Sequence, residues 1–130
     1  MGKLSDCEVV LKKDKVYTSY FSKATKIVPD RRLVSIALTH PEGWKATYYR
    51  HLNPSINMLM ARKNGEMSDA EFEETYRNEV LRHLDPNRVY QDLKGKVMCC
   101  WEKTGDFCHR HIVTAWLQEN LGEEVVGGEI

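Results

Sequence analysis

A short, almost unbroken apolar run constrains the fold of this chain most. Residues 33–38 read Leu-Val-Ser-Ile-Ala-Leu, and Thr39-His40-Pro41 closes the run. A run of this length that ends at proline is typical of a strand buried on both faces, which is the pattern of a parallel sheet. A second run at residues 96–101, Lys-Val-Met-Cys-Cys-Trp, has the same character. The two runs predict an α/β fold.

Helical patterns lie between and after these runs. A first strand is expected at 15–21, which is rich in aromatic and β-branched residues. Ser68-Asp69-Ala70-Glu71 matches a capping box and predicts a helix with an apolar stripe that begins at Phe72. The fourfold spacing of aromatic and apolar residues over 44–53 favours a further helix, and 108–120 has one apolar face.

The domain organisation follows from length and from the order of these elements. A chain of 130 residues is large enough for one hydrophobic core. We therefore expect a single small three-layer α/β domain over residues 1–122, with a mostly parallel, Rossmann-like sheet. Residues 123–130 contain two adjacent glycines, and we expect a flexible tail there.

Charge and targeting signals narrow the class of protein. Nineteen Lys and Arg balance nineteen Asp and Glu, and no basic patch is evident in the sequence, which argues against nucleic-acid binding through a positive field. A specific nucleic-acid or nucleotide pocket stays open. No apolar run approaches the ~20 residues of a membrane span. Residues 1–15 lack the apolar core of a signal peptide. We expect a cytoplasmic protein whose four cysteines are thiols or ligands. The sequence does not identify a cofactor or an oligomeric state.

The chemistry concentrates where the second apolar run ends. Ligands of open α/β sheets bind beyond the carboxyl ends of the strands. There Glu102 is followed by Cys108-His109-Arg110-His111 at the start of a predicted helix. The amide groups of a helix start favour an anion and lower the pKa of a thiol. We therefore assign Cys108 as nucleophile, His109 as acid or base, Arg110 as anion clamp and Glu102 as base or orienting group, in a solvent-reachable crevice. His40 takes the equivalent place at the other strand end.

Other interpretations of the same residues remain open. Cys99 and Cys100 lie in an apolar strand, where cysteine is commonly a small core residue. Either of them, with Cys108 and His109 or His111, offers zinc ligands, although no C-x-x-C pair is present. Five aromatic residues form either a stacking face for a base or part of the core. They are Tyr17, Tyr20, Trp44, Tyr48 and Tyr49.

The stretch from residue 97 to 113 resembles family 488 of the domains of unknown function, which is found in bacteria, archaea and phages. That family has an apolar strand ending in Leu-Cys and a Glu-Lys-like pair, then a short loop and Cys-His-Arg opening a helix. The residues that match are Cys99, Glu102, Cys108, His109 and Arg110, together with Phe72 and Tyr76 of a Phe-x-x-x-Tyr pattern. The family's Asp-x-Arg-like element is absent at 35–41, where His40 is the available substitute.

These observations lead to one preferred function and two alternatives. The preferred function is an anion or nucleotide pocket at the Cys-His-Arg helix start, in an enzyme acting on a nucleotide or nucleic acid. Its catalytic residues are Cys108, His109 and Glu102, and its ligand-binding residues are Arg110, Cys99, His40 and Tyr76. The alternatives are a non-catalytic module that binds a small anionic ligand, and a structural protein with a Cys/His metal site.

Overall fold

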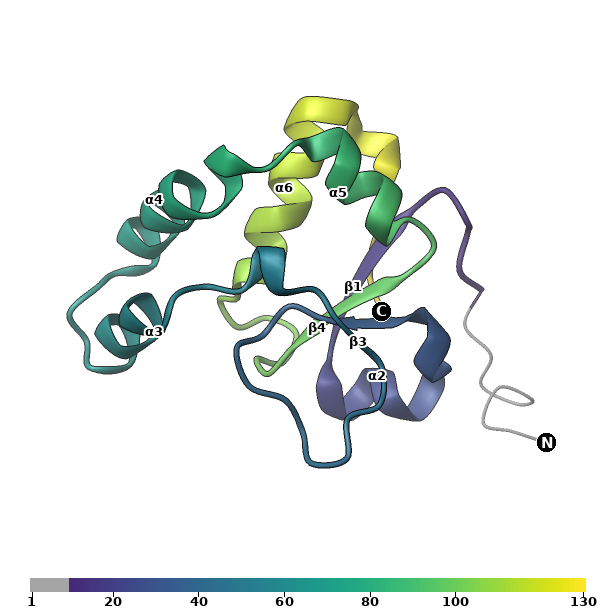
Figure 1. Cartoon of the computed structure of the whole chain (residues 1–130), viewed down its shortest axis with the longest axis horizontal. Coiled ribbons are helices and arrows are strands. Elements are labelled where there is room, and N and C mark those ends of the chain that lie inside the picture. Colours follow the sequence, from purple (N-terminus) through teal and green to yellow (C-terminus); the bar gives the residue numbers. More distant parts are fainter. Residues whose placement is uncertain (1–9) are drawn as a thin grey trace.

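The computed structural model describes residues 10–130, which form an α/β structure around one sheet (Figure 1). All five strands are parallel, in the order β3-β2-β4-β1-β5. The prediction of a small three-layer α/β domain with a parallel sheet is confirmed. The strands are β1 (Val16–Tyr20), β2 (Leu33–Ser35), β3 (Thr47–Tyr48), β4 (Val97–Cys100) and β5 (Val126–Glu129).

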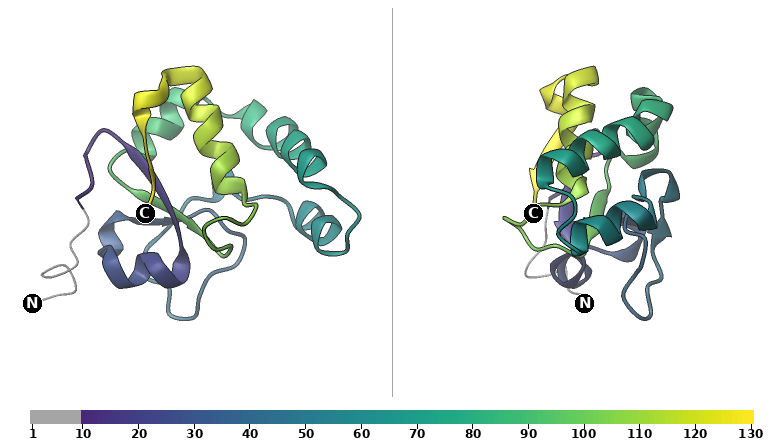
Figure 2. Two further views of the ribbon diagram at one scale, coloured as in Figure 1. Left: turned by 180° about the vertical axis from the view of Figure 1, so that it is seen from behind. Right: turned by 90° about the vertical axis from the view of Figure 1, so that its left-hand side faces the viewer.

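Helices cover both faces of this sheet. Figure 1 shows α5 and α6 on one side and α2 on the other, and Figure 2 shows α3 and α4 extending beside α6. The helices are α2 (Phe21–Ile27), α3 (Ile56–Lys63), α4 (Asp69–Glu79), α5 (Pro86–Leu93) and α6 (His109–Leu121). The capping box predicted before α4 is present, with Ser68 and Glu71 each accepting a hydrogen bond from the other's main-chain N–H. No helix among residues 10–130 has both the length and the apolar character that crossing a membrane requires.

The core has two parts, one on each side of the sheet. The larger part packs the inner faces of α4, α5 and α6 against the strands, with Met98 and Leu117 fully buried. The smaller part lies under α2 and contains Phe21 together with the buried cysteines 99, 100 and 108. All three of these cysteines are therefore packed within the core.

The helix predicted over residues 44–53 is wrong. Thr47 and Tyr48 form the edge strand β3, and a single 3-10 turn follows at Arg50–Leu52. The backbone N–H of Tyr49 donates to the carbonyl of Ser35, which extends the pairing of β3 with β2. The aromatic residues that suggested a helix make tertiary contacts instead, such as the edge contact of Trp44 with Phe21. Pairing with the neighbouring strand overrides the local pattern.

The flexible tail expected at 123–130 is also not what the structure shows. A 3-10 turn at Glu123–Val125 leads into β5, which pairs with β1, and the N–H of Ile130 donates to the carbonyl of Thr18. A Cβ on Gly127 would lie 2.2 Å from the ring of Tyr17. The glycine that suggested mobility is therefore the residue that lets β5 pack against that ring.

Candidate functional site

The carboxyl ends of the central strands meet the start of α6. Because the strands are parallel, β4 ends at Cys100 on the same edge where the chain leaves β2 towards Ile36. Cys108 is the N-cap of α6, as the sequence predicted, and it adopts an extended backbone. The predicted strand, loop and helix thus bring the cysteine, histidine and arginine of the motif to the edge where α/β proteins bind ligands.

Cys100 and Cys108 form a disulfide in this structure. We expected thiols, and an open crevice at Cys108; instead the side chains of both cysteines are buried, with exposed fractions of 1% and 3%. The partner of Cys108 is Cys100, which the sequence analysis had left open between a core residue and a metal ligand. The crevice expectation is therefore corrected: Cys108 is buried against Cys100 at the carboxyl end of β4.

Cys99 lies apart from this pair and is a free cysteine. Its Sγ is 3.7 Å from the carbonyl oxygen of Val97, and burial raises the pKa of its thiol to about 12. Successive side chains of a strand point to opposite faces, so Cys99 and Cys100 have different surroundings. The residue that the resemblance matched is thus one position away from the residue that contacts Cys108. Cys7 lies outside the described residues.

Arg110 is fully buried and already holds a carboxylate of the chain itself. Its Nε and Nη2 donate to the two carboxylate oxygens of Glu129, at 3.1 and 2.8 Å. Its Nη1 lies 2.9 Å from the Sγ of Cys100 and 2.8 Å from the carbonyl oxygen of Glu102. We had assigned Arg110 as the clamp for a ligand anion, but Glu129 occupies that place.

Glu129 is a site residue that the sequence analysis missed. Burial raises the pKa of its carboxyl group, but hydrogen bonds from Arg110, Thr104 and Thr18 outweigh burial and lower it to about 2. The hydroxyls of Thr18 and Thr104 donate to its two oxygens at 2.5 and 2.7 Å. Glu129 lies in β5, in the segment expected to be a tail, so only the pairing of β5 with β1 reveals its role.

His109 is buried and is held in one tautomer. Its Nε2 lies 2.7 Å from the carbonyl oxygen of Ile36, and because a carbonyl can only accept, Nε2 carries the proton. Nδ1 is then an acceptor, 3.8 Å from the Sγ of Cys108. Burial lowers the pKa of His109 to about 4. The imidazole is therefore neutral at neutral pH and presents a lone pair to the Cys108 sulfur.

Tyr76 supports His109 from the α4 side. Its ring centroid lies 5.5 Å from that of His109, and its hydroxyl donates to the carbonyl of Leu52 at 2.6 Å. Tyr76 is fully buried. Its hydroxyl is therefore engaged within the protein, and the residue packs against the imidazole instead of facing solvent.

Glu102, His40 and His111 are less closely associated with the cysteine pair. Glu102 and His111 are exposed. The contact of Glu102 with Arg110 is made by its main-chain carbonyl, which accepts a hydrogen bond from the guanidinium. His40 forms a separate cluster, with Nδ1 2.8 Å from the Oγ of Ser35 and its ring 4.3 Å from that of Tyr48. Burial and the nearby Arg50 guanidinium lower the pKa of His40.

A metal-binding arrangement is also present. One ligand atom from each of Cys100, Cys108 and His109 lies within 4.8 Å of the others, and all three residues are buried. Thiolate sulfur and imidazole nitrogen are typical zinc ligands. The alternative of a Cys/His metal site thus has three of its ligands in Cys100, Cys108 and His109, whereas Cys99 and His111 lie outside this set.

The family model for the active DUF488-N3 subclade matches residues 16–121. The chain belongs to the DUF488 family. The match spans every described strand except β5, so it includes both cysteines of the disulfide but not Glu129. No curated protein and no solved structure matches the chain.

Two small cavities reach the cysteine pair of this DUF488 protein. One, of about 50 Å³, is lined partly by Cys108, His109 and Phe107. The other, of about 60 Å³, is lined partly by Cys100, Trp101 and His109. Each is large enough for a few water molecules. Although the two cysteines are buried, each of them lines a small hollow.

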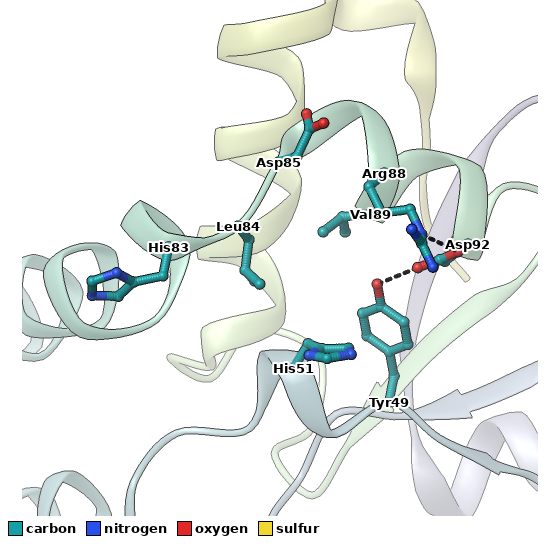
Figure 3. Close-up of a pocket in the computed structure, with 8 residues that line it drawn as sticks. All are labelled: Tyr49, His51, His83, Leu84, Asp85, Arg88, Val89 and Asp92. Atoms are coloured by element: carbon teal, nitrogen blue, oxygen red, sulfur yellow. Dashed lines mark hydrogen bonds and ion pairs between the residues drawn. The ribbon is translucent and has the colours of Figure 1, made fainter.

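A larger hollow of the DUF488 protein lies away from this site (Figure 3). It has a volume of about 240 Å³, and within it the hydroxyl of Tyr49 donates to Asp92 at 2.6 Å. The aromatic residues considered as a stacking face do not share one surface. Tyr49 lines this hollow, Tyr17 is in the core, and the rings of Trp44 and Tyr48 contact His40.

Proposed function

We propose that this DUF488 protein is a thiol-dependent enzyme in which reduced Cys100 is the nucleophile and Cys108 is its partner thiol. One observation carries the proposal: the guanidinium of Arg110 lies 2.9 Å from the Sγ of Cys100. The description of the matched subclade as active agrees with it. The role given to Cys108 in the sequence analysis passes to Cys100 because the cation contacts Cys100.

The electrostatics favour a thiolate at Cys100. A positive charge beside a thiol stabilises its ionised form. Glu129 fixes the guanidinium through two hydrogen bonds, so the cation keeps its position when the disulfide opens. Arg110 therefore acts as a positioning residue for the nucleophile, and we no longer propose that it binds a nucleotide or another ligand anion.

Cys108 is placed to complete a two-thiol reaction. It caps α6, whose amino-terminal dipole favours a negative charge, and its Sγ lies 3.8 Å from the Nδ1 of the neutral His109. The disulfide shows that the sulfur of Cys108 can reach the sulfur of Cys100. Cys108 can therefore attack Cys100 and displace a group bound to it. This favours substrates that present an electrophilic sulfur atom.

The proposed reaction consumes one substrate S–S bond. The Cys100 thiolate attacks one sulfur of the substrate, and the other sulfur leaves as a thiolate with the electron pair of the broken bond. Cys108 gives its proton to the first departing thiolate and attacks the Cys100 sulfur, and the second substrate sulfur leaves as a thiolate. The Cys100–Cys108 disulfide forms, and its two electrons have reduced the substrate.

The test uses the reduced protein with Cys7→Ser and a small disulfide that releases a coloured thiolate. We expect the parent chain to release two thiolates rapidly and to finish with an internal disulfide. Cys108→Ser should release one and retain a mixed disulfide on Cys100, detected by mass spectrometry, whereas Cys100→Ser should lose the rapid phase. Cys99→Ala is the matched control and should behave like the parent. A rapid phase that survives in Cys100→Ser would overturn the proposal.

A metal centre is the second candidate, because Cys100, Cys108 and His109 are within ligand distance of one ion. The Arg110 guanidinium weighs against it, since a cation beside a ligand sulfur opposes a second positive charge. Elemental analysis of protein purified under reducing conditions decides between the two. Stoichiometric zinc that disappears in both Cys108→Ser and His109→Gln would support the metal centre, and metal-free reduced protein would exclude it.

A further inference from the structure

Basic residues gather at the edge of the sheet opposite the cysteine pair. The residue immediately before each of the three central strands is positively charged. These residues are Arg32 before β2, Lys96 before β4 and Lys15 before β1. The register pairs Leu33 and Tyr17 with Val97, so the three cations enter neighbouring strands at about the same level. Neighbouring strands are about 4.8 Å apart. The parallel sheet thus forms a row of positive charges at its amino-terminal edge.

A hollow of about 260 Å³ lies at this edge. Its described lining residues are four cations and one glycine, without a carboxylate: Lys13, Arg32, Lys94, Gly95 and Lys96. Lys13 and Lys94 are exposed, whereas Arg32 and Lys96 are half-buried. The ion pairs found in residues 10–130 use other arginines, so these four charges face the hollow without a carboxylate partner from the described chain.

Main-chain hydrogen bonds hold the hollow in shape. The Nε of Arg32 donates to the carbonyl of Gly95 at 2.5 Å, and the N–H of Gly95 donates to the carbonyl of Lys15 at 2.7 Å. Gly95 has a φ of +79°, and a Cβ there would lie 3.2 Å from the carbonyl oxygen of Lys13. The segment before β4 is therefore tied closely to the segment before β1, and the cations are held around the hollow.

We infer that this basic hollow binds the phosphodiester backbone of a nucleic acid. Four like charges in one place repel each other, and a run of phosphates offsets that repulsion. The hollow is open, so it suits a polymer that passes across it better than a small ligand that must be enclosed. It is concave and presents no large apolar side chain, which does not suit a bilayer surface.

The balanced net charge does not oppose this inference, because the two signs are separated in space. The acidic residues of α4 lie on the extension beside α6, away from the amino-terminal edge of the sheet (Figure 1). The sequence analysis found no basic patch because these cations come from separate segments that only the parallel sheet brings together. The inference is independent of the proposed thiol chemistry, since Lys96 precedes β4 and Cys100 ends it.

The experiment measures fluorescence anisotropy of a labelled single-stranded oligonucleotide with the full chain at several salt concentrations. We expect the logarithm of affinity to fall linearly with that of salt, with a slope of about −2 to −3 for three or four phosphate contacts. Replacing Lys13, Lys94 and Lys96 together by Gln should reduce the magnitude of this slope to about 0.7 or below. Binding at low salt should weaken by about tenfold or more.

The matched control removes three charges elsewhere. Lys23→Gln, Lys45→Gln and Lys63→Gln together give the same net charge, and this variant should keep the parent slope. Urea unfolding verifies that both triple variants are folded. Equal weakening by the two variants, absence of binding at low salt, or equally tight binding of an acidic peptide of the same charge would each overturn the inference. If the hollow variant fails to fold, Lys94→Glu alone, at an exposed position, must still weaken binding.

Discussion

The guanidinium of Arg110 forms a fork with the carboxylate of Glu129, joining the first turn of α6 to the last strand of the sheet. The side chain of Arg110 is fully buried, and that of Glu129 has an exposed fraction of 18%. The guanidinium of Arg110 is therefore shielded from water, and Glu129 is its only ion-pair partner among the described residues. Both the stability of the protein and the electrostatics of Cys100 depend on this pair.

Replacing Glu129 by Gln should lower the free energy of unfolding by about 3 kcal/mol, because it leaves a buried guanidinium without its counter-charge. Urea denaturation measures the loss. Glu119→Gln is the matched control, since Glu119 pairs with Arg77 near the surface and its loss should cost less than about 1 kcal/mol. Similar small losses in both variants would contradict the role assigned to the buried pair.

Acid should weaken the fold through Glu129 in a defined pH window. The pKa of its carboxyl group falls from an ordinary 4.5 to about 2 in the folded protein. The unfolded chain therefore binds a proton first, and the stabilisation is complete above pH 4.5 and is lost as the pH falls towards 2. Unfolding free energies of the parent and of Glu129→Gln, measured across this window, should converge at the acid end. Parallel curves would contradict the prediction.

His109 should remain neutral well below neutral pH. Its pKa is lowered from 6.5 to about 4, chiefly by burial. Because the unfolded histidine takes up a proton first, its contribution to stability is complete above pH 6.5 and declines as the pH falls to about 4. Nitrogen NMR should report the Nε2–H tautomer at pH 6. An imidazolium signal for His109 at that pH would show that the Ile36 carbonyl and burial do not control the ring.

Tyr76→Phe should lower the free energy of unfolding by about 1–3 kcal/mol, because it leaves the buried carbonyl of Leu52 without its donor. Tyr48→Phe is the control, because Tyr48 is 42% exposed and its change should have an effect of less than about 0.5 kcal/mol. Thermal unfolding of both variants measures the difference. Equal midpoints would mean that the Tyr76 hydroxyl is not important for packing around His109.

The parts of the fold that the sequence predicted are those with local signals. Three such signals are the apolar run that ends at Cys100, the apolar face of α6 and the capping box at Ser68. Each of them can be recognised within a short stretch of consecutive residues. Those signals were sufficient to place Cys108 at a helix start. The neighbours of Cys108 were harder to predict, because a shift of one residue along a strand turns the side chain to the other face. Cys99 and Cys100 differ by that shift.

The missed parts depend on contacts between distant segments. Thr18 and Glu129 are 111 residues apart, and no pattern within 123–130 indicates that this segment pairs with β1. The two-residue strand β3 is likewise determined by the open edge of β2. The basic hollow has the same origin, since Lys13, Arg32 and Lys96 belong to three segments. Pairing across the sheet, and not local propensity, places these residues.

The position of β4 between β1 and β2 has a consequence for the way the chain folds. β1 and β2 do not hydrogen-bond to each other. Each of them pairs instead with β4, which is formed by residues 97–100. Sheet assembly therefore requires contacts at long sequence separation, which slows folding. A fragment ending before β4 should show helical signal from α4 and α5 but no native pairing of β1, whose neighbours β4 and β5 are both missing. Its amides in β1 should exchange with solvent without protection.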